Sequence, residues 1–253
     1  MSESHEDTVR SSFRRQVDLF RGEDSPFASR VPNLEWLGPI SPEMVALEVA
    51  CGAAHVAEQL APHVRAVSGI DLTRELLELG SERMRLAGVT NVVLQEGNAE
   101  KLPFVDDSFD LAYCRASLHH MADPRRAVAE MVRVCRPGGR VAISDLVVPN
   151  QEVREQFDAV HRLLDPSHMR AFCEDELVAI FPDDVQVSPV TVWSGRMPID
   201  RVMTAQSDRV ALHTLLEAEI DGGRATGFEP AWEDDQLIVC FATGSFDAVK
   251  PRD

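Results

Sequence analysis

The sequence of 253 residues lacks the features that mark a membrane, secreted or metal-binding protein. No apolar run approaches the roughly 20 residues that span a bilayer. The first ten residues lack the basic and then apolar order of a signal peptide. The five cysteines are scattered without a CxxC pair, which argues against a zinc knuckle or a disulfide framework. We therefore expect a cytoplasmic protein with buried thiols and no metal.

Basic residues are also scarce. Lys and Arg together number 25 against 42 Asp and Glu, so the net charge is −17. A surface of this sign repels the phosphates of nucleic acid and, at long range, any polyanionic substrate. Hydrophobic residues make up 44% of the chain, enough for a large folded core. We expect a small-molecule partner, no nucleic acid and no membrane, with a homodimer as the assembly to test.

Short apolar runs alternate with amphipathic segments in the middle of the chain. Strands are predicted at about residues 44–50, 65–70, 91–96, 109–114 and 140–148, and helices at about 53–61, 73–87 and 124–135. Strands and helices that alternate with short connections indicate a parallel sheet with right-handed crossovers. The pattern therefore predicts an open, doubly wound α/β fold.

The flanking segments depart from this alternation. Residues 5–21 are predicted as a helix whose apolar stripe either packs on the core or forms a lid over a ligand. Residues 22–42 contain four prolines and are expected to be mostly loop, with a short helix near 34–37. Beyond residue 150, two short helices form an insertion. A strand (185–193), helical stretches (198–221) and a last strand (236–246) follow.

The first predicted strand ends in a tight turn of small residues. Such a turn directs backbone N–H groups and a helix N-terminus toward a ligand, and Gly52 allows close approach because it has no Cβ. Asp71 follows Gly52 by 19 residues at the tip of the next strand, where a carboxylate can accept both hydroxyls of a ribose. The pair favours a nucleoside cofactor over an ordinary turn with a surface acid. Ala50 and Ala54 stand where a glycine-rich loop usually has Gly.

Four stretches carry a family resemblance: LEVACGAAHVAEQLAP, GIDLT, GNAEKLPFVDDSFDLAYCRASLHHMADP and VCRPGGRVAISDLVVP. In this order they resemble class I S-adenosylmethionine-dependent methyltransferases, most closely the type 11 group of ubiquinone and menaquinone biosynthesis. The resemblance implies a Rossmann-like, doubly wound, seven-stranded and mostly parallel sheet whose last strand is antiparallel. It divides the chain into an N-terminal helical lid (1–43), a cofactor-binding core (44–149), a helical insertion that serves as acceptor lid (150–183) and the rest of the sheet (184–253).

The resemblance also implies which residues hold S-adenosylmethionine and its product S-adenosylhomocysteine. Those around the methionine, ribose and adenine parts would be Glu48, Ala50, Gly52, Asp71, Leu72, Asn98, Ala99 and Arg115. The family usually has Gly at position 54, and Asp more often than Asn at 98. If residue 54 requires a positive φ, Ala costs about 1 kcal/mol or more, roughly a tenfold change in affinity. Asn98 can still hydrogen-bond an adenine edge through its amide.

Histidines supply the candidate catalytic groups. His119 and His120 follow the fourth strand, at the carboxyl-end crevice where ligands bind in such sheets. A base near a hydroxyl nucleophile would assist methyl transfer, and of the two we favour His120, with a structural role left open. His168 lies in a turn of the insertion, where it either reaches the acceptor or belongs to a turn that caps the next element. Trp193 is expected in the core rather than in the acceptor pocket.

We predict transfer of a methyl group from S-adenosylmethionine to a small, largely apolar acceptor of secondary metabolism. A hydroxyl of an aromatic or polyketide-like compound is the expected nucleophile. Two alternatives stay open: methylation of carbon, as in quinone biosynthesis, and a scaffold repurposed for a non-methylating reaction such as cyclisation. Ala54 is the feature that motivates the repurposed scaffold. A non-catalytic binding module has less support, because the acceptor-lid segments are present.

Overall fold

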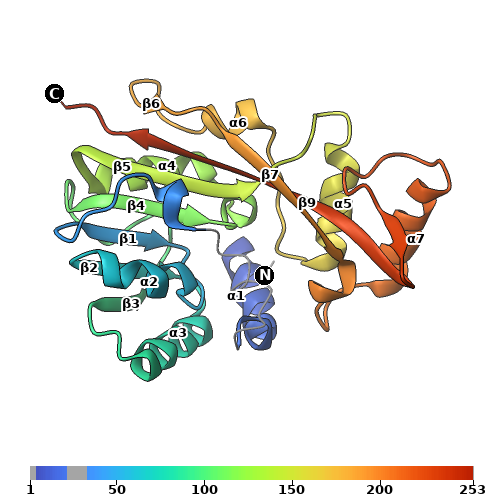
Figure 1. Cartoon of the computed structure of the whole chain (residues 1–253), viewed down its shortest axis with the longest axis horizontal. Coiled ribbons are helices and arrows are strands. Elements are labelled where there is room, and N and C mark those ends of the chain that lie inside the picture. Colours follow the sequence, from blue (N-terminus) through green and yellow to red (C-terminus); the bar gives the residue numbers. More distant parts are fainter. Residues whose placement is uncertain (1–3, 22–32, 253) are drawn as a thin grey trace.

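The computed structural model describes residues 4–21 and 33–252 and has a twisted sheet at its centre (Figure 1). The strands are β1 (Val45–Val49), β2 (Ala66–Asp71), β3 (Val92–Glu96), β4 (Phe109–Arg115), β5 (Cys135–Leu146), β6 (Gln186–Val187), β7 (Thr191–Pro198), β8 (Ala231–Glu233) and β9 (Gln236–Val249). The first five pair in parallel in the order β3-β2-β1-β4-β5, and β9 continues the sheet antiparallel to β5. The open α/β sheet with an antiparallel last strand is confirmed.

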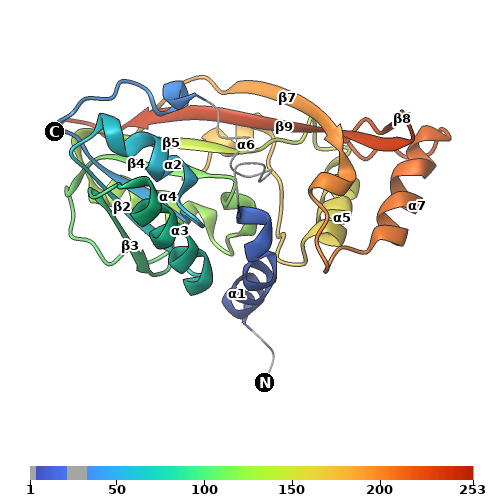
Figure 2. The ribbon, with the colours of Figure 1, turned by 60° about the horizontal axis from the view of Figure 1, so that its bottom comes forward.

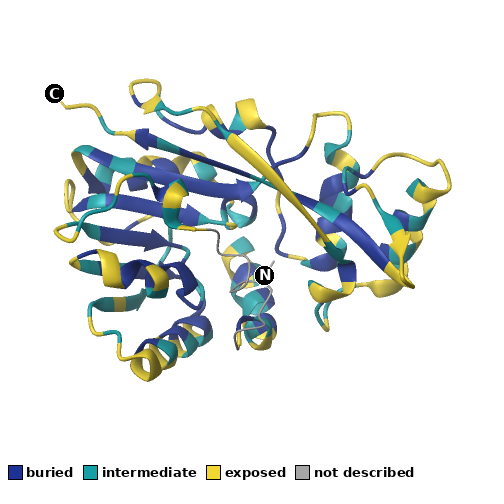
Figure 3. Cartoon of the chain, in the orientation of Figure 1, coloured by how far each residue is buried: buried dark blue, intermediate teal, exposed yellow. Residues whose placement is uncertain are grey.

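The expected count of seven strands was wrong, since the described residues form nine. The predicted strand over 185–193 is two strands, β6 and β7, which pair with successive parts of β9. β9 is 14 residues long and extends well beyond the parallel core. The first residues of β9, in the part beyond the core, also pair with β8. The first six residues of β7 are all exposed, while β9 beside it is largely buried (Figure 3).

The helices cover both faces of the sheet. They are α1 (His5–Gln16), α2 (His55–Leu60), α3 (Arg74–Ala87), α4 (Pro124–Val134), α5 (Arg154–Leu164), α6 (Glu174–Val178) and α7 (Arg209–Ile220), with short 3-10 turns η1 (Val17–Phe20), η2 (Leu34–Leu37), η3 (Ala61–His63), η4 (Leu118–His120) and η5 (Ile199–Arg201). Leu47 and Val49 pack with α4, whereas Ala46, the residue before Leu47, packs with α2 on the opposite face. This alternation of side chains along a strand makes the fold doubly wound.

A second hydrophobic cluster lies beyond the parallel core. α5, α7 and the distal part of β9 enclose it, with Phe157, Phe228 and Phe241 in contact at its centre. Figures 1 and 2 show β9 joining this lobe, which we call the distal lobe, to the parallel core. The insertion therefore packs its own apolar core against the extended end of the sheet.

Helix α1 lies between the parallel core and the distal lobe (Figure 2). A reciprocal capping box of Ser4 and Asp7 starts the helix. The predicted apolar stripe packs on the start of α2 and on α3, where Phe20 is buried against Ala53 and Leu76. None of the described helices is long and apolar enough to cross a bilayer.

Candidate active site

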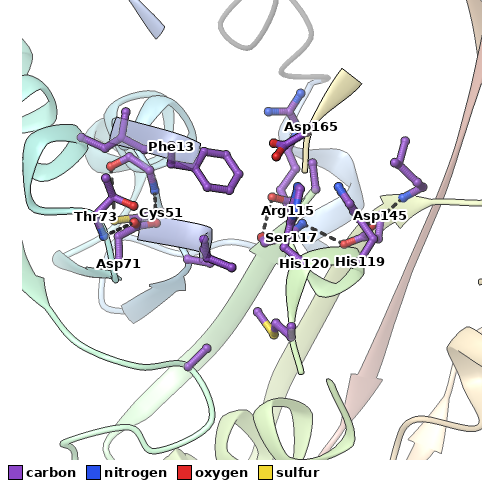
Figure 4. Close-up of a pocket in the computed structure, with 18 of the residues that line it drawn as sticks. Phe13, Cys51, Asp71, Thr73, Arg115, Ser117, His119, His120, Asp145 and Asp165 are labelled. Atoms are coloured by element: carbon purple, nitrogen blue, oxygen red, sulfur yellow. Dashed lines mark hydrogen bonds and ion pairs between the residues drawn. The ribbon is translucent and has the colours of Figure 1, made fainter. Parts of the chain in front are cut away.

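A cavity of about 590 Å³ opens at the carboxyl ends of β1, β2 and β4 (Figure 4). α1 and the distal lobe close its other sides. Every predicted cofactor residue lies on its wall: Glu48, Ala50, Gly52, Asp71, Leu72, Asn98, Ala99 and Arg115. His119 and His120 line the same cavity, and His168 is not among its described lining residues. The structure thus brings the predicted cofactor residues and two of the three candidate histidines to one cavity.

The turn after β1 repeats the left-handed backbone conformation. Ala50, Gly52 and Ala54 have φ of 53°, 52° and 56°, a region that L-residues with a Cβ avoid. The Cys51 N–H donates to the Ile70 carbonyl (3.0 Å), and the Ala54 N–H donates to the Cys51 carbonyl (2.8 Å). Residue 54 therefore has the positive φ on which the expected cost of Ala at this position depends. Its Cβ is fully buried in the core, away from the described cavity wall.

Asp71 ties this turn to the tip of β2. Its two carboxylate oxygens accept one backbone hydrogen bond each, from the Gly52 N–H (2.8 Å) and the Thr73 N–H (2.8 Å). Burial raises the pKa of Asp71, and these two hydrogen bonds oppose the rise. Each oxygen keeps a second lone pair, so the carboxylate can accept two further hydroxyl groups.

Glu48 and Arg115 lie at the base of the cavity. Glu48 Oε2 accepts hydrogen bonds from the Ala57 N–H (2.9 Å) and the Tyr113 hydroxyl (3.3 Å). Burial raises the pKa of Glu48 to about 8. Burial also lowers the pKa of Arg115, although the attraction of Glu48 opposes this shift. The pair offers one carboxyl and one guanidinium to a ligand that carries both an amine and a carboxylate.

His119 is oriented by a residue that the sequence analysis missed. Asp145, fully buried at the end of β5, accepts a hydrogen bond from His119 Nδ1 (2.5 Å) (Figure 4). It also accepts three backbone N–H groups, from Ser117 (2.9 Å), Leu118 (2.7 Å) and Leu146 (2.7 Å). Burial alone would raise the pKa of Asp145, but His119 and these hydrogen bonds outweigh it, and the pKa lies below its ordinary value. In the neutral imidazole, Nδ1 therefore carries the proton and Nε2 keeps its lone pair.

His120 is held differently. Its Nδ1 lies 3.0 Å from the Ser167 hydroxyl, which in turn bonds to Asp165 (2.7 Å). Its ring packs edge-on against Phe13 of α1, with centroids 5.0 Å apart. Burial, followed by the neighbouring His119, lowers the pKa of His120 to about 3. This ring is therefore a much weaker base than free imidazole.

His168 lies behind the cavity wall. Its side chain is fully buried, and Nε2 bonds to Asp158 (2.7 Å). The turn that contains His168 forms backbone hydrogen bonds to His119: the N–H groups of Met169 (2.9 Å) and Arg170 (3.2 Å) both donate to the His119 carbonyl. This placement favours the structural reading of the turn over contact with an acceptor.

The distal lobe supplies wall residues that the sequence analysis did not nominate. His161 of α5 is buried on the wall, and its Nε2 has no hydrogen-bond partner within the described part of the chain. Leu164, Met197 and Phe241 add apolar surface beside it. Trp193 also lines the cavity and is 46% exposed, so the expectation of a core position was wrong.

Comparison with known proteins identifies the family. Residues 47–143 match a family model described as a methyltransferase domain. YcgJ of Bacillus subtilis, an uncharacterized methyltransferase, is 41% identical over 154 residues, which are 60% of this chain and 60% of YcgJ. The crystal structure of YcgJ aligns with a TM-score of 0.77 at 30% identity, over 85% of this chain and 94% of YcgJ. The chain belongs to the methyltransferase family.

Two further comparisons concern one sequence relative and one structure of the same fold. Demethylmenaquinone methyltransferase of Listeria monocytogenes is 35% identical to this chain over 133 residues, 51% of this chain and 56% of the relative. The chain therefore spans little more than half the length of that relative. The [4+2]-cyclase SpnF shares the fold, with a TM-score of 0.59 at 17% identity over 84% of this chain and 76% of SpnF.

The family match covers only part of the cavity wall. Residues 47–143 include residues 50–54 after β1, which we call the cofactor turn, together with Asp71 and the two histidines after β4. Asp145, α1 and α5 lie outside the matched range. Family membership therefore says least about the residues that form the rest of the cavity wall.

Proposed function

We propose that this methyltransferase transfers a methyl group from S-adenosylmethionine to an oxygen atom of a small, largely apolar acceptor. The observation that carries the proposal is the His119–Asp145 pair, which lies on the wall of the same cavity as the cofactor turn. A base oriented in this way can accept a proton from a hydroxyl while the methyl group is transferred.

The residues present fit S-adenosylmethionine. Asp71 offers free lone pairs to the ribose hydroxyls, and Arg115 and the protonated Glu48 offer a guanidinium and a neutral carboxyl group to the amino-acid end. A Cβ added at Gly52 would make ordinary van der Waals contact with Phe20 (3.6 Å) and Leu76 (3.8 Å), so glycine suits this position through its positive φ of 52°. When bound, S-adenosylmethionine supplies an electrophilic methyl group on a sulfonium. The chain supplies the binding, the orientation and the base.

His119 is the better oriented of the two candidate bases. Asp145 fixes its Nδ1 as a donor, which leaves Nε2 to receive the hydroxyl proton as the oxygen becomes methylated. The ion pair with Asp145 stabilises the resulting imidazolium. The sequence favoured His120, but the pKa of His120 is lowered to about 3, and its Nδ1 forms a hydrogen bond with the Ser167 hydroxyl.

The wall chemistry favours an uncharged acceptor. Arg115 is the sole Lys or Arg among the described lining residues, and it lies beside Glu48. A phosphorylated or carboxylated acceptor would therefore find no free counter-charge in the distal lobe. Apolar side chains and the buried His161 suit a ring system that carries a neutral oxygen.

Methylation of carbon is the second candidate, because a demethylmenaquinone methyltransferase is among the relatives. The same base could ionise a phenolic hydroxyl and so activate the adjacent ring carbon. The position of the new methyl group on the product distinguishes the two reactions.

The test uses S-adenosylmethionine with an isotopically labelled methyl group and a panel of phenols, naphthols and hydroquinones. We expect labelled O-methyl product, and its loss by at least a hundredfold in His119→Ala with S-adenosylhomocysteine still bound. His120→Ala is the matched comparison and should retain much more activity. Labelled C-methyl product would support the second candidate. Conversion of an acceptor without label transfer would refute methylation and favour a repurposed scaffold.

A further inference from the structure

The amide of Asn98 is held in one orientation by two neighbours. Its Oδ1 accepts the Glu100 N–H at 2.7 Å, and its Nδ2 donates to Glu6 Oε1 of α1 at 2.7 Å. A carboxylate can only accept, so the nitrogen must face Glu6. Both Glu6 and Asn98 line the cavity, next to Leu72 and Ala99 at the end expected to hold the adenine.

The position of Glu6 is set by its helix. Arg10, one turn further along α1, forms an ion pair with Glu96 at the tip of β3 (2.6 Å). Arg14, one more turn along, pairs with Glu75 of α3 (2.6 Å). These contacts join one face of α1 to the rim of the parallel core, so Glu6 reaches Asn98 from a helix that is anchored at two further points.

Adenine presents a 6-amino donor beside the N1 acceptor on its exposed edge. An aspartate at position 98 can accept the amino hydrogen directly. In this chain Asn98 turns its N–H groups outward and its oxygen is already engaged by Glu100. The negatively charged acceptor at this place is Glu6, 92 positions away in the sequence.

We propose that Glu6 is an adenine-binding residue of the cofactor site. Its carboxylate accepts the hydrogen bond of the 6-amino group, and Asn98 orients that carboxylate while its second N–H serves N1. The chain thus supplies from α1 the carboxylate that position 98 lacks. The proposal rests on the proposed use of S-adenosylmethionine and adds a cofactor contact from outside residues 47–143.

A reciprocal exchange of amide and carboxylate tests the pairing. Calorimetric titration with S-adenosylhomocysteine is compared for the native chain, Glu6→Gln, Asn98→Asp and the double variant. We expect Glu6→Gln to weaken binding about tenfold, because a charge-assisted hydrogen bond becomes a neutral one. Asn98→Asp places two carboxylates in contact and should also weaken binding. In the double variant the two contacts to the base are also exchanged: the carboxylate at position 98 accepts the 6-amino group and the amide at position 6 donates to N1, so the affinity should return to within about threefold of the native value.

Asp7→Asn is the matched control for helix stability. Asp7 is also an acid of the first turn and takes part in the capping box, but it bonds Ser4 and not Asn98. We expect this variant to bind S-adenosylhomocysteine within about twofold of the native chain. If Asp7→Asn weakens binding as much as Glu6→Gln and the double variant is not rescued, Glu6 acts only through α1 and the proposal is overturned.

A deaminated ligand gives a second readout. S-Inosylhomocysteine carries an oxygen in place of the 6-amino group, which would face the Glu6 carboxylate unfavourably. The native chain should therefore prefer S-adenosylhomocysteine. Glu6→Gln should reduce that preference, since a glutamine amide can donate to the oxygen, while the N1 hydrogen of hypoxanthine faces the Asn98 N–H in both proteins. Equal preference in the two proteins would refute the contact with adenine. Failure of the native chain to bind S-adenosylhomocysteine at all would instead refute the proposed function, and this inference with it.

Discussion

Replacing Asp145 with Asn probes both the fold and the proposed chemistry. One carboxylate oxygen accepts His119 Nδ1 and the Leu146 N–H, and the other accepts the N–H groups of Ser117 and Leu118. The asparagine NH₂ group cannot accept a hydrogen bond. In either orientation of the side chain it faces two groups that donated hydrogen bonds to the native carboxylate. The least costly arrangement places it toward His119, because that ring can change tautomer and accept through Nδ1. The Leu146 N–H is then left buried without an acceptor.

The magnitude follows from this arrangement. One buried unsatisfied donor costs about 1–3 kcal/mol, and the loss of charge from the remaining hydrogen bonds adds to it. We expect Asp145→Asn to lower the free energy of unfolding by about 2–4 kcal/mol in urea titrations at pH 7. The changed tautomer also puts the proton of His119 on Nε2, which removes its ability to act as a base.

Asp158→Asn is the matched control. Its carboxylate bonds His168 Nε2 (2.7 Å) and the Ala171 N–H (2.9 Å), also in a buried setting but off the described cavity wall. Both variants should lose stability, but only Asp145→Asn should change the tautomer of His119, as read from two-bond ¹H–¹⁵N correlations. If His119 keeps its proton on Nδ1 and the stability changes by less than about 0.5 kcal/mol, the assigned role of Asp145 is wrong.

The pH dependence gives an independent check. The pKa of Asp145 in the folded protein lies below its unfolded value of about 3.9. Its stabilising contribution is therefore complete above that value and is lost as the pH falls through the folded pKa. The native chain should lose more stability between about pH 4 and pH 2 than Asp145→Asn does. Equal acid sensitivity of the two proteins would contradict the assignment.

Three further predictions concern the cofactor turn, Glu48 and helix α1. Ala50→Gly should raise the free energy of unfolding by about 0.5–1 kcal/mol, because it relieves a left-handed Ala at a half-buried position. Ala54→Gly should change the free energy of unfolding little, because it relieves the same conformation but also removes a buried methyl worth about 0.8 kcal/mol. Glu48 keeps its proton up to about pH 8 when folded but ionises near 4.5 when unfolded, so stability falls as the pH rises across this window, and Glu48→Gln should lack that fall in urea titrations. Asp165→Asn should increase deuterium uptake in α1 more than in β1 to β5, because Ser12 and Gln16 bond that carboxylate at 2.7 Å each, and equal uptake would contradict the anchoring role.

The sequence predicted the elements around the proposed cofactor end of the cavity because their signals are local. The turn at Gly52, the acid at Asp71 and the alternating strands are encoded within short segments, and all occur where expected. The acceptor half depends on contacts between distant segments, such as His5 with the His120 carbonyl (2.6 Å), which no periodic pattern records. Asp145 was missed because an acid at a strand end resembles many others until the strand order brings it to His119. The pairing of β7 with β9 was missed for the same reason.

The two departures from the usual family residues have different physical consequences. Ala54 has a positive φ, but its Cβ points into the core and not toward the described cavity wall. Its cost therefore falls on the stability of the turn rather than on the space for a ligand, and Ala54→Gly should leave the affinity for S-adenosylhomocysteine within about twofold. Asn98 lies on the wall and changes the charge that a ligand meets there, and Glu6 supplies a carboxylate at hydrogen-bond distance. Ala54 alone is thus a weak reason to infer a scaffold that has given up its cofactor. A large gain in affinity in Ala54→Gly would reverse this argument, since it would mean that the turn itself limits binding.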